Sequence, residues 1–184
     1  MRGLSLVLVA LGLEQHFPHG VEEFCHFIVA ELLCHGGNIG GVMPEIQTKI
    51  WMALRTRIEA ISPAIPTAWP AEVFTPPVDS GSVPAPLPYL SIGKVTAPPQ
   101  RVLIGRGKHW HTGSVTIVRV APLGPPEEAH TEAAGKIAAH FPEDLLMPFM
   151  GVCVRVVSYP TVADGYRDGG YWRVPIIIPW RVAA

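Results

Sequence analysis

From Glu45 onward, the apolar positions of the chain become orderly and follow the spacing of an α-helix. Apolar residues recur every three or four positions over residues 46–61, and Lys, Arg and Glu lie off that stripe, which predicts an amphipathic helix. Pro44 and Glu45 suit the first turn, and Ser62-Pro63 ends the helix. The stripe consists of Ile46, Ile50, Leu54, Ile58 and Ile61.

A second helical segment opens at residues 125–128, where two prolines precede two glutamates. Prolines and carboxylates are both favoured at a helix N-terminus. The apolar positions that follow are mostly alanines, which indicates close approach to a sheet, and Pro142 ends the segment. The residues predicted to face the core are Ala129, Ala133, Ile137, Ala138 and Phe141.

Short runs rich in β-branched and aromatic residues predict the strands of a sheet. Together with the helices they give the order α-β-β-β-β-α-β-β. This order predicts an α+β domain that has a mainly antiparallel sheet with two helices packed on one face. Ser114–Val120 is apolar on both faces, so we expect it to be a central strand. The predicted strands are residues 71–74, 89–96, 101–104, 114–120, 152–158 and 171–180.

The last predicted strand, residues 171–180, carries the strongest β-forming sequence of the chain. Its even-numbered residues from Trp172 to Trp180 are predicted to share one face. Pro175 and Pro179 cannot donate ladder hydrogen bonds, so the sequence predicts an edge strand. A bare apolar edge invites aggregation, and we therefore expect a second subunit to cover it. The predicted subunit interface consists of Tyr171, Trp172, Arg173, Ile177, Trp180 and Arg181.

Two further segments are set apart by their composition. Residues 76–88 form a loop rich in Pro, Ser and Gly that is long enough to be functional or interface-forming. Residues 1–42 differ from the rest and end in the glycine-rich break GGNIGG, just before Met43. They are either an N-terminal arm or an extension from a start site assigned too early. The predicted domain is therefore residues 43–184.

Composition excludes several classes of protein. A net charge of −1 over 184 residues gives no basic excess that would indicate nucleic acid binding by the whole chain. Three cysteines without CxxC spacing indicate neither a disulfide framework nor a zinc site. No apolar run reaches the roughly 18 residues of a membrane-spanning helix. The apolar start resembles a signal peptide, but no small-residue cleavage site follows it.

The stretch around residues 101–111 carries the only concentrated candidate chemistry. Arg101, Arg106 and Lys108 are interrupted by glycines. This predicts either a flexible loop that contacts DNA phosphates or an acidic neighbour, or a solvated hairpin tip. His109 and His111 would point to the same side of a strand, as the ligands of a metal-dependent hydrolase would. Because no further metal-binding motif accompanies them, a solvent-facing pair is the favoured interpretation. No GxSxG motif is present.

Several of these elements together resemble one family over about residues 43–184. They are the N-terminal helix, Pro88-Tyr89-Leu90, Gly113 before the central strand, and the alanine-rich helix that closes with Phe141. Gly151 before Val154-Arg155-Val156 and the ending DGGYWRVP…IPWR at residues 168–181 complete the pattern. The chain resembles the tail terminator (tail completion) proteins of long-tailed bacteriophages, which also occur in gene transfer agents.

The resemblance implies a homo-oligomeric, hexameric ring that caps the major tail tube protein and stops tube polymerisation. It also implies a joining surface for the head–tail connector protein and a lumen through which DNA passes with transient, non-specific contact. No catalysis, cofactor or membrane is implied, and the location would be the virion tail or neck after assembly in the host cytoplasm. Arg101, Arg106, Lys108, His109 and His111 would then face the lumen or the tube. Another neck, head–tail joining or minor tail protein is the alternative.

Overall fold

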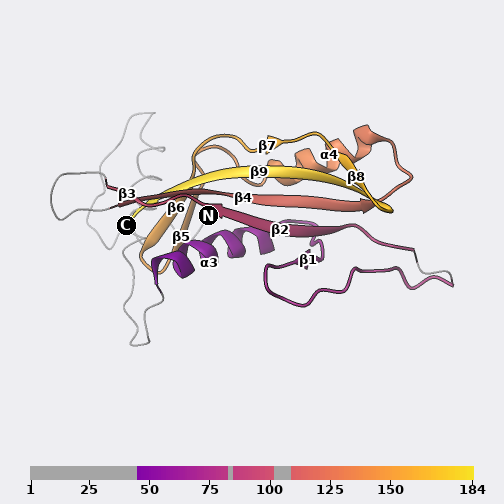
Figure 1. The fold of residues 1–184 in the computed structure, drawn as a ribbon, viewed down its shortest axis with the longest axis horizontal. Helices are drawn as coiled ribbons and strands as arrows, with labels where there is room; N and C mark the ends of the chain where they lie inside the picture. The colour runs from indigo at the N-terminus through magenta and orange to yellow at the C-terminus, as the bar shows by residue number, and fades with distance from the viewer. Residues whose placement is uncertain (1–44, 83–84, 102–108) are drawn as a thin grey trace, which may run out of the picture.

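The computed structural model describes residues 45–82, 85–101 and 109–184. It has a long twisted sheet and two helices, α3 and α4, which pack on one face of that sheet (Figure 1). The α+β prediction is confirmed, and the prediction for residues 1–42 concerns residues outside the described part of the chain. The elements are α3 (Ile46–Glu59), β1 (Thr67–Ala68), β2 (Tyr89–Thr96), β3 (Gln100–Arg101), β4 (His109–Pro122), α4 (Glu127–Ala138), β5 (Leu146–Phe149), β6 (Val152–Val156), β7 (Thr161–Val162), β8 (Tyr166–Asp168) and β9 (Tyr171–Ala183).

The strands are joined in the order β1-β2-β4-β9-β6-β5. β3 pairs with β4, while β7 and β8 pair with β9. All pairs are antiparallel except β1 with β2, so the sheet is mixed rather than purely antiparallel. The predicted central strand is confirmed, because β4 lies between β2 and β9 and is longer than the sequence pattern indicated.

The prediction that the last strand lies at a sheet edge is wrong. β9 pairs with β4 along one side and with β6, β7 and β8 along the other. The carbonyl of Pro175 accepts from Ala163 and that of Pro179 accepts from Val157. A residue in an antiparallel strand directs its N–H and C=O to the same side. Both missing donors therefore face the breaks between β6, β7 and β8, and the ladder to β4 is intact.

Several strand boundaries also differ from the sequence prediction. Residues 71–74 form no strand, and the pairing segment is Thr67–Ala68 instead. Ala71 has φ 65°, which is incompatible with an extended ladder. Of the strand predicted over 101–104, the described part is β3. β5 was not predicted, because its four residues include Pro148 and carry too little periodicity to identify.

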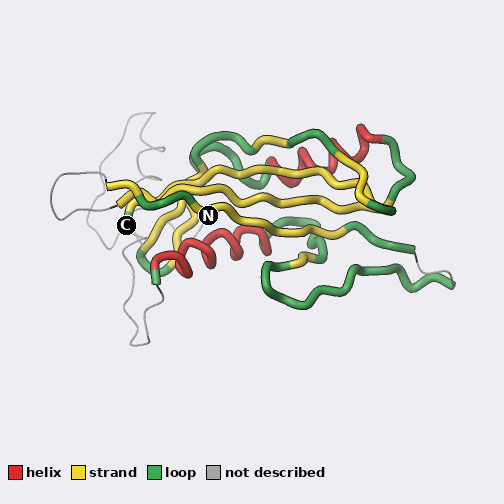
Figure 2. Tube along the Cα trace, viewed as in Figure 1, coloured by secondary structure: helices red, strands yellow, loops and turns green. Residues whose placement is uncertain are grey.

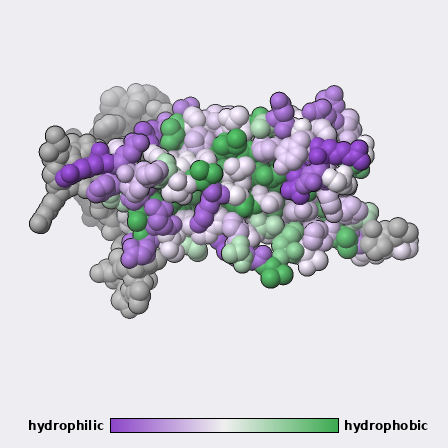
Figure 3. Space-filling model, viewed as in Figure 1, coloured by the Kyte–Doolittle hydropathy of each residue, from purple (hydrophilic) through white to green (hydrophobic). Residues whose placement is uncertain are grey.

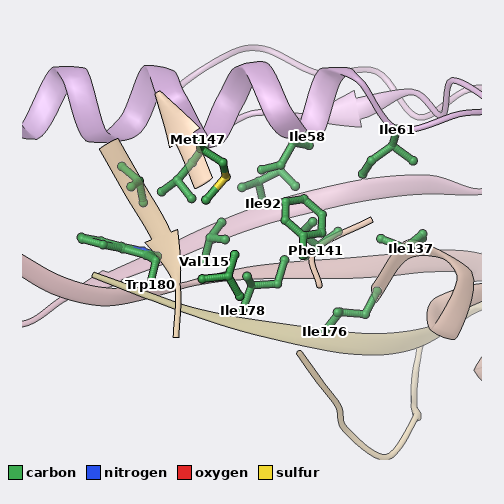
Figure 4. Close-up of a cluster of buried hydrophobic side chains, with 14 of the residues drawn as sticks. Ile58, Ile61, Ile92, Val115, Ile137, Phe141, Met147, Ile176, Ile178 and Trp180 are labelled. Carbon is green, nitrogen blue, oxygen red and sulfur yellow. The ribbon is translucent and has the colours of Figure 1, made fainter. Parts of the chain in front are cut away.

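The core lies between the sheet and the two helices (Figure 4). Even-numbered residues of β9 from Val174 to Val182 are buried, so the predicted alternation is confirmed. The stripe of α3 includes Ile50, Leu54 and Ile58, each 2% exposed. α4 departs from the prediction by one position: His130 and Ala134 are buried, whereas Ala129 is exposed. Predicted core residues Ile137, Ala138 and Phe141 are confirmed.

Arg57 connects the two helices directly. Its guanidinium, on α3, donates from Nε to the backbone carbonyl of His140 just after α4, at 3.0 Å. A cation near the last carbonyls of a helix satisfies orphan acceptors and favours the negative end of the helix dipole. The contact fixes the end of α4 against α3 above the core.

Candidate assembly surfaces

The face of the sheet opposite the helices is formed by the alternate residues of the three longest strands. Cross-strand rows run through it, such as Gly93–Thr116–Ile177–Thr161. We call this surface the outer face. It consists of Ser91, Gly93 and Val95 of β2, Ser114, Thr116 and Val118 of β4, and Pro175, Ile177 and Pro179 of β9.

The outer face contains no charged residue, and its apolar side chains are partly solvent-exposed. Val95 is 65% exposed and Ile177 37%. Charged side chains lie beyond its ends: Arg173 pairs with Asp168 at 2.8 Å, and Arg181 lies over the Trp110 ring at 5.3 Å. Figure 3 shows hydrophobic and hydrophilic residues interspersed over the side of the molecule that faces the viewer. An uncharged strip of this kind is typical of a contact surface.

The segment that leads away from β1 is fixed on both sides of the sheet. Trp69 packs edge-on against Trp51 of α3, with ring centroids 6.0 Å apart. Phe74 packs on Tyr89 at 5.0 Å, and Tyr89 faces away from the core because the adjacent Leu90 is buried. Tyr171 adds to this outer cluster, 6.3 Å from Tyr89. The chain therefore crosses from the helix side to the outer side before residue 76.

Beyond this anchor, the chain projects from the body as a narrow loop (Figures 1 and 2). We call residues 76–82 and 85–88 the arm. Val78 forms an isolated antiparallel bridge with Pro86. Val78 is 57% exposed and Leu87 40%. The sequence prediction that this Pro-rich loop is more than a simple turn is thus supported by its extended, apolar and partly self-bonded structure.

The described residues that border the predicted basic loop, Arg101 and His109, lie at the other end of the sheet. Arg101 is in β3, which pairs with the start of β4, whereas Arg106 and Lys108 lie outside the described residues. The arm ends where β2 begins, and this is the same end of the sheet at which β9 begins. Because β9 has 13 residues, these two ends of the sheet are about 40 Å apart. They would therefore meet different neighbours in an assembly.

The favoured interpretation of His109 and His111 as a solvent-facing pair is wrong for His111. His109 is exposed, whereas His111 is 8% exposed and faces the helix side, where its Nδ1 lies 3.4 Å from Nε2 of Gln47. Within the described part of the chain, no group of three or more His, Cys, Asp or Glu residues could hold a metal ion. The geometry therefore adds nothing to the metal-hydrolase alternative.

The predicted interface residues divide between surface and core. Ile177 lies on the outer face, and Tyr171, Arg173 and Arg181 flank it. Trp180, by contrast, is 3% exposed and belongs to the core of its own chain. Trp172 is half-buried on the helix side, where its ring lies 6.3 Å from His130.

A partly buried pair of basic groups was not predicted. Nη1 of Arg119 on β4 lies 3.0 Å from Nδ1 of His130 on α4, and His130 is 3% exposed. Burial lowers the pKa of His130, the nearby Arg119 charge lowers it further, and a backbone hydrogen bond at Pro125 opposes both. Burial also lowers the pKa of Arg119. The Arg donor fixes His130 as a neutral acceptor. The alternating pattern of the strand could not reveal this pair, because Arg119 lies on β4 and His130 lies on α4.

The pair predicts a stability loss in mild acid. Because the pKa of His130 is lowered in the folded state, the unfolded chain binds the extra proton first as the pH falls below about 6.5. The free energy of unfolding should therefore be unaffected above that pH and should decrease below it, by at most about 1.4 kcal/mol per pH unit from this group. Urea unfolding of His130→Gln should show a shallower decrease between pH 7.5 and 5; an equal decrease would contradict the assignment.

Other kinds of site find little support in the described structure. A pocket of about 230 Å³ lies beside the end of α3, lined mainly by apolar residues such as Ile58, Ile61 and Trp69. It is smaller than typical small-molecule sites. None of the described helices is long and apolar enough to cross a membrane.

The mixed sheet and its two helices define an α+β protein, and the uncharged outer face is a candidate contact surface. A family model for phage tail terminator proteins matches residues 49–180, so the chain belongs to the phage tail terminator family. It is thus a structural component of the phage tail and interacts with other tail components. The chain is also similar to a protein of solved structure, with 25% sequence identity and a TM-score of 0.55. The similarity covers 77% of this chain and 96% of that one. No curated protein matches.

Proposed function

We propose that this chain assembles into a ring that caps the tail tube, ends its polymerisation and provides the surface for the head connector. The match of the family model over residues 49–180 carries the proposal. The number of subunits that we propose is six, as the family resemblance implies. The role requires recognition of other chains and no catalysis, so neither a cofactor nor a resident metal is proposed.

The shape of the subunit supports a role between two different partners. A capping ring must contact the tube on one side and the connector on the other, in addition to its own neighbours. The described chain has distinct surfaces for this: the end of the sheet where β9 begins, the β3–β4 end about 40 Å away, and the outer face between them. Different surfaces allow these contacts to form without competition.

We also propose that the β3–β4 end faces the lumen or the tube. Arg101 and His109 lie at this end, and the sequence adds Arg106 and Lys108 between them. DNA that passes through the ring must slide, so contacts with phosphates should be weak and sensitive to salt. Assembly of the virion tail in the host cytoplasm completes the proposal.

Tail assembly without this chain tests the function. Phage or gene transfer agent particles that lack it should have tubes of abnormal length and no attached heads, because polymerisation no longer stops at a capped end. Tube length in electron micrographs is the measurement, and supplying the wild-type chain should restore it. Tubes of normal length that lack heads would instead support the alternative of a neck or head–tail joining protein.

A further inference from the structure

We propose that the arm of one subunit lies across the outer face of a second copy of this chain. The proposal deepens the proposed ring function and rests on it, since it identifies the contact between neighbouring subunits. The arm and the outer face are different surfaces, so the contact is heterologous. Repeating such a contact produces a closed ring whenever the rotation between subunits closes.

The arm is ordered before it meets any partner. The Asp79 amide donates to the carbonyl of Ala85 at 2.9 Å, and the Leu87 amide donates to that of Pro77 at 2.9 Å. Oδ1 of Asp79 accepts from the amides of Gly81 and Ala85, at 3.0 and 3.2 Å. Prolines further restrict the backbone. Docking of this preformed loop therefore costs less conformational entropy than docking of a flexible one.

The chemistry of the two surfaces is complementary. Val78 and Leu87 of the arm are exposed although they are apolar, and Asp79, the arm's one charged residue, holds its own turn. The outer face carries no charged residue, and its apolar side chains Ile177 and Val95 are exposed. Contact between them would bury apolar area without leaving a charge unpaired. Neither surface carries a Lys or Arg, so nucleic acid is a poor occupant for both.

The dimensions of the two surfaces also agree. One limb of the arm, residues 76–80, spans roughly 16 Å when extended. The three strands of the outer face, together with the adjacent β7, extend over about 14 Å from β2 to β7. The arm points away from its own sheet in Figure 1. Its apolar side chains therefore require a neighbouring copy rather than their own outer face.

Mixing two defective variants tests this contact. Val78→Asp disables the arm and Ile177→Glu disables the outer face, each by placing an uncompensated negative charge in the contact, so that the two altered surfaces repel each other in a mixture. Each variant alone should assemble at least about tenfold more weakly than wild type. An equimolar mixture should form heterodimers and no rings, because only one arm and one outer face remain intact in each pair. Analytical ultracentrifugation provides the measurement.

The control is Val73→Asp, the same substitution at a residue that is 103% exposed and lies outside both surfaces. It should form wild-type rings, and all three variants should unfold at the wild-type temperature because the altered side chains are exposed. Rings that persist in both Val78→Asp and Ile177→Glu would overturn the arm contact alone. Wild-type protein that stays monomeric even with tail tubes would instead contradict the proposed ring function.

Discussion

Replacing Phe141 with alanine is expected to remove about 3–5 kcal/mol from the free energy of unfolding. Phe141 is completely buried and lies among side chains from the sheet and α4 in Figure 4, including Ile92, Ile137 and Ile176. It follows directly after α4, where its amide donates to the carbonyl of Ala138 at 2.9 Å. Truncation would leave a cavity bordered by β2, β9 and α4, and these three elements cannot all move inward to fill it.

Chemical unfolding of the purified chain measures this loss. Domains of this size are stable by about 5–15 kcal/mol, so much of the margin should disappear. Tyr159→Ala is the control, since Tyr159 is 56% exposed and its truncation should change stability by less than about 0.5 kcal/mol. Equal stability of the two variants would show that Phe141 does not hold the helices to the sheet.

Replacing Gly113 with alanine should also destabilise the fold, by at least about 2 kcal/mol. A Cβ at this position in β4 would lie 2.6 Å from Cζ2 of Trp180 and would overlap the backbone oxygen of Val95. The Val95 carbonyl is held in β2 and the Trp180 ring is buried, so neither can move easily to make room for a methyl group. Gly113 therefore lies where β2, β4 and the Trp180 ring pack closely together.

Gly135→Ala provides a control of opposite sign. A Cβ at Gly135 in α4 would meet nothing within 4 Å, and alanine is favoured over glycine in a helix by up to about 1 kcal/mol. This variant should melt at a higher temperature than wild type, whereas Gly113→Ala should melt at a lower one. A Gly113→Ala protein that melts at or above the wild-type temperature would contradict the packing of Trp180 over β4.

The elements that the sequence predicted well are those in which local pattern and tertiary contacts agree. The helical spacing of Ile50, Leu54 and Ile58 also defines the buried face of α3. The alternation along residues 171–180 likewise matches burial in β9. In both cases one periodic stripe meets one continuous core, so the period alone identifies the buried side.

The predictions failed where the outcome depends on a partner strand or on another element. Pro175 and Pro179 indicated an edge, but which side a missing donor faces is set by the register between β9 and its neighbours. The stripe of α4 includes His130, which a hydropathy pattern treats as polar, because Arg119 from β4 satisfies it. The sequence indicated that residues 76–88 were important, yet the arm is defined by long-range contacts at Trp69 and Phe74.

Imaging the purified chain together with tail tubes tests the central claim most directly. Negative-stain electron microscopy should show closed rings of the chain in isolation and one ring on a single end of each tube. Tubes capped in this way should not lengthen when more tube protein is added. Uncapped tubes that continue to grow beside a monomeric chain would contradict the proposal that this protein is the ring that terminates the tail.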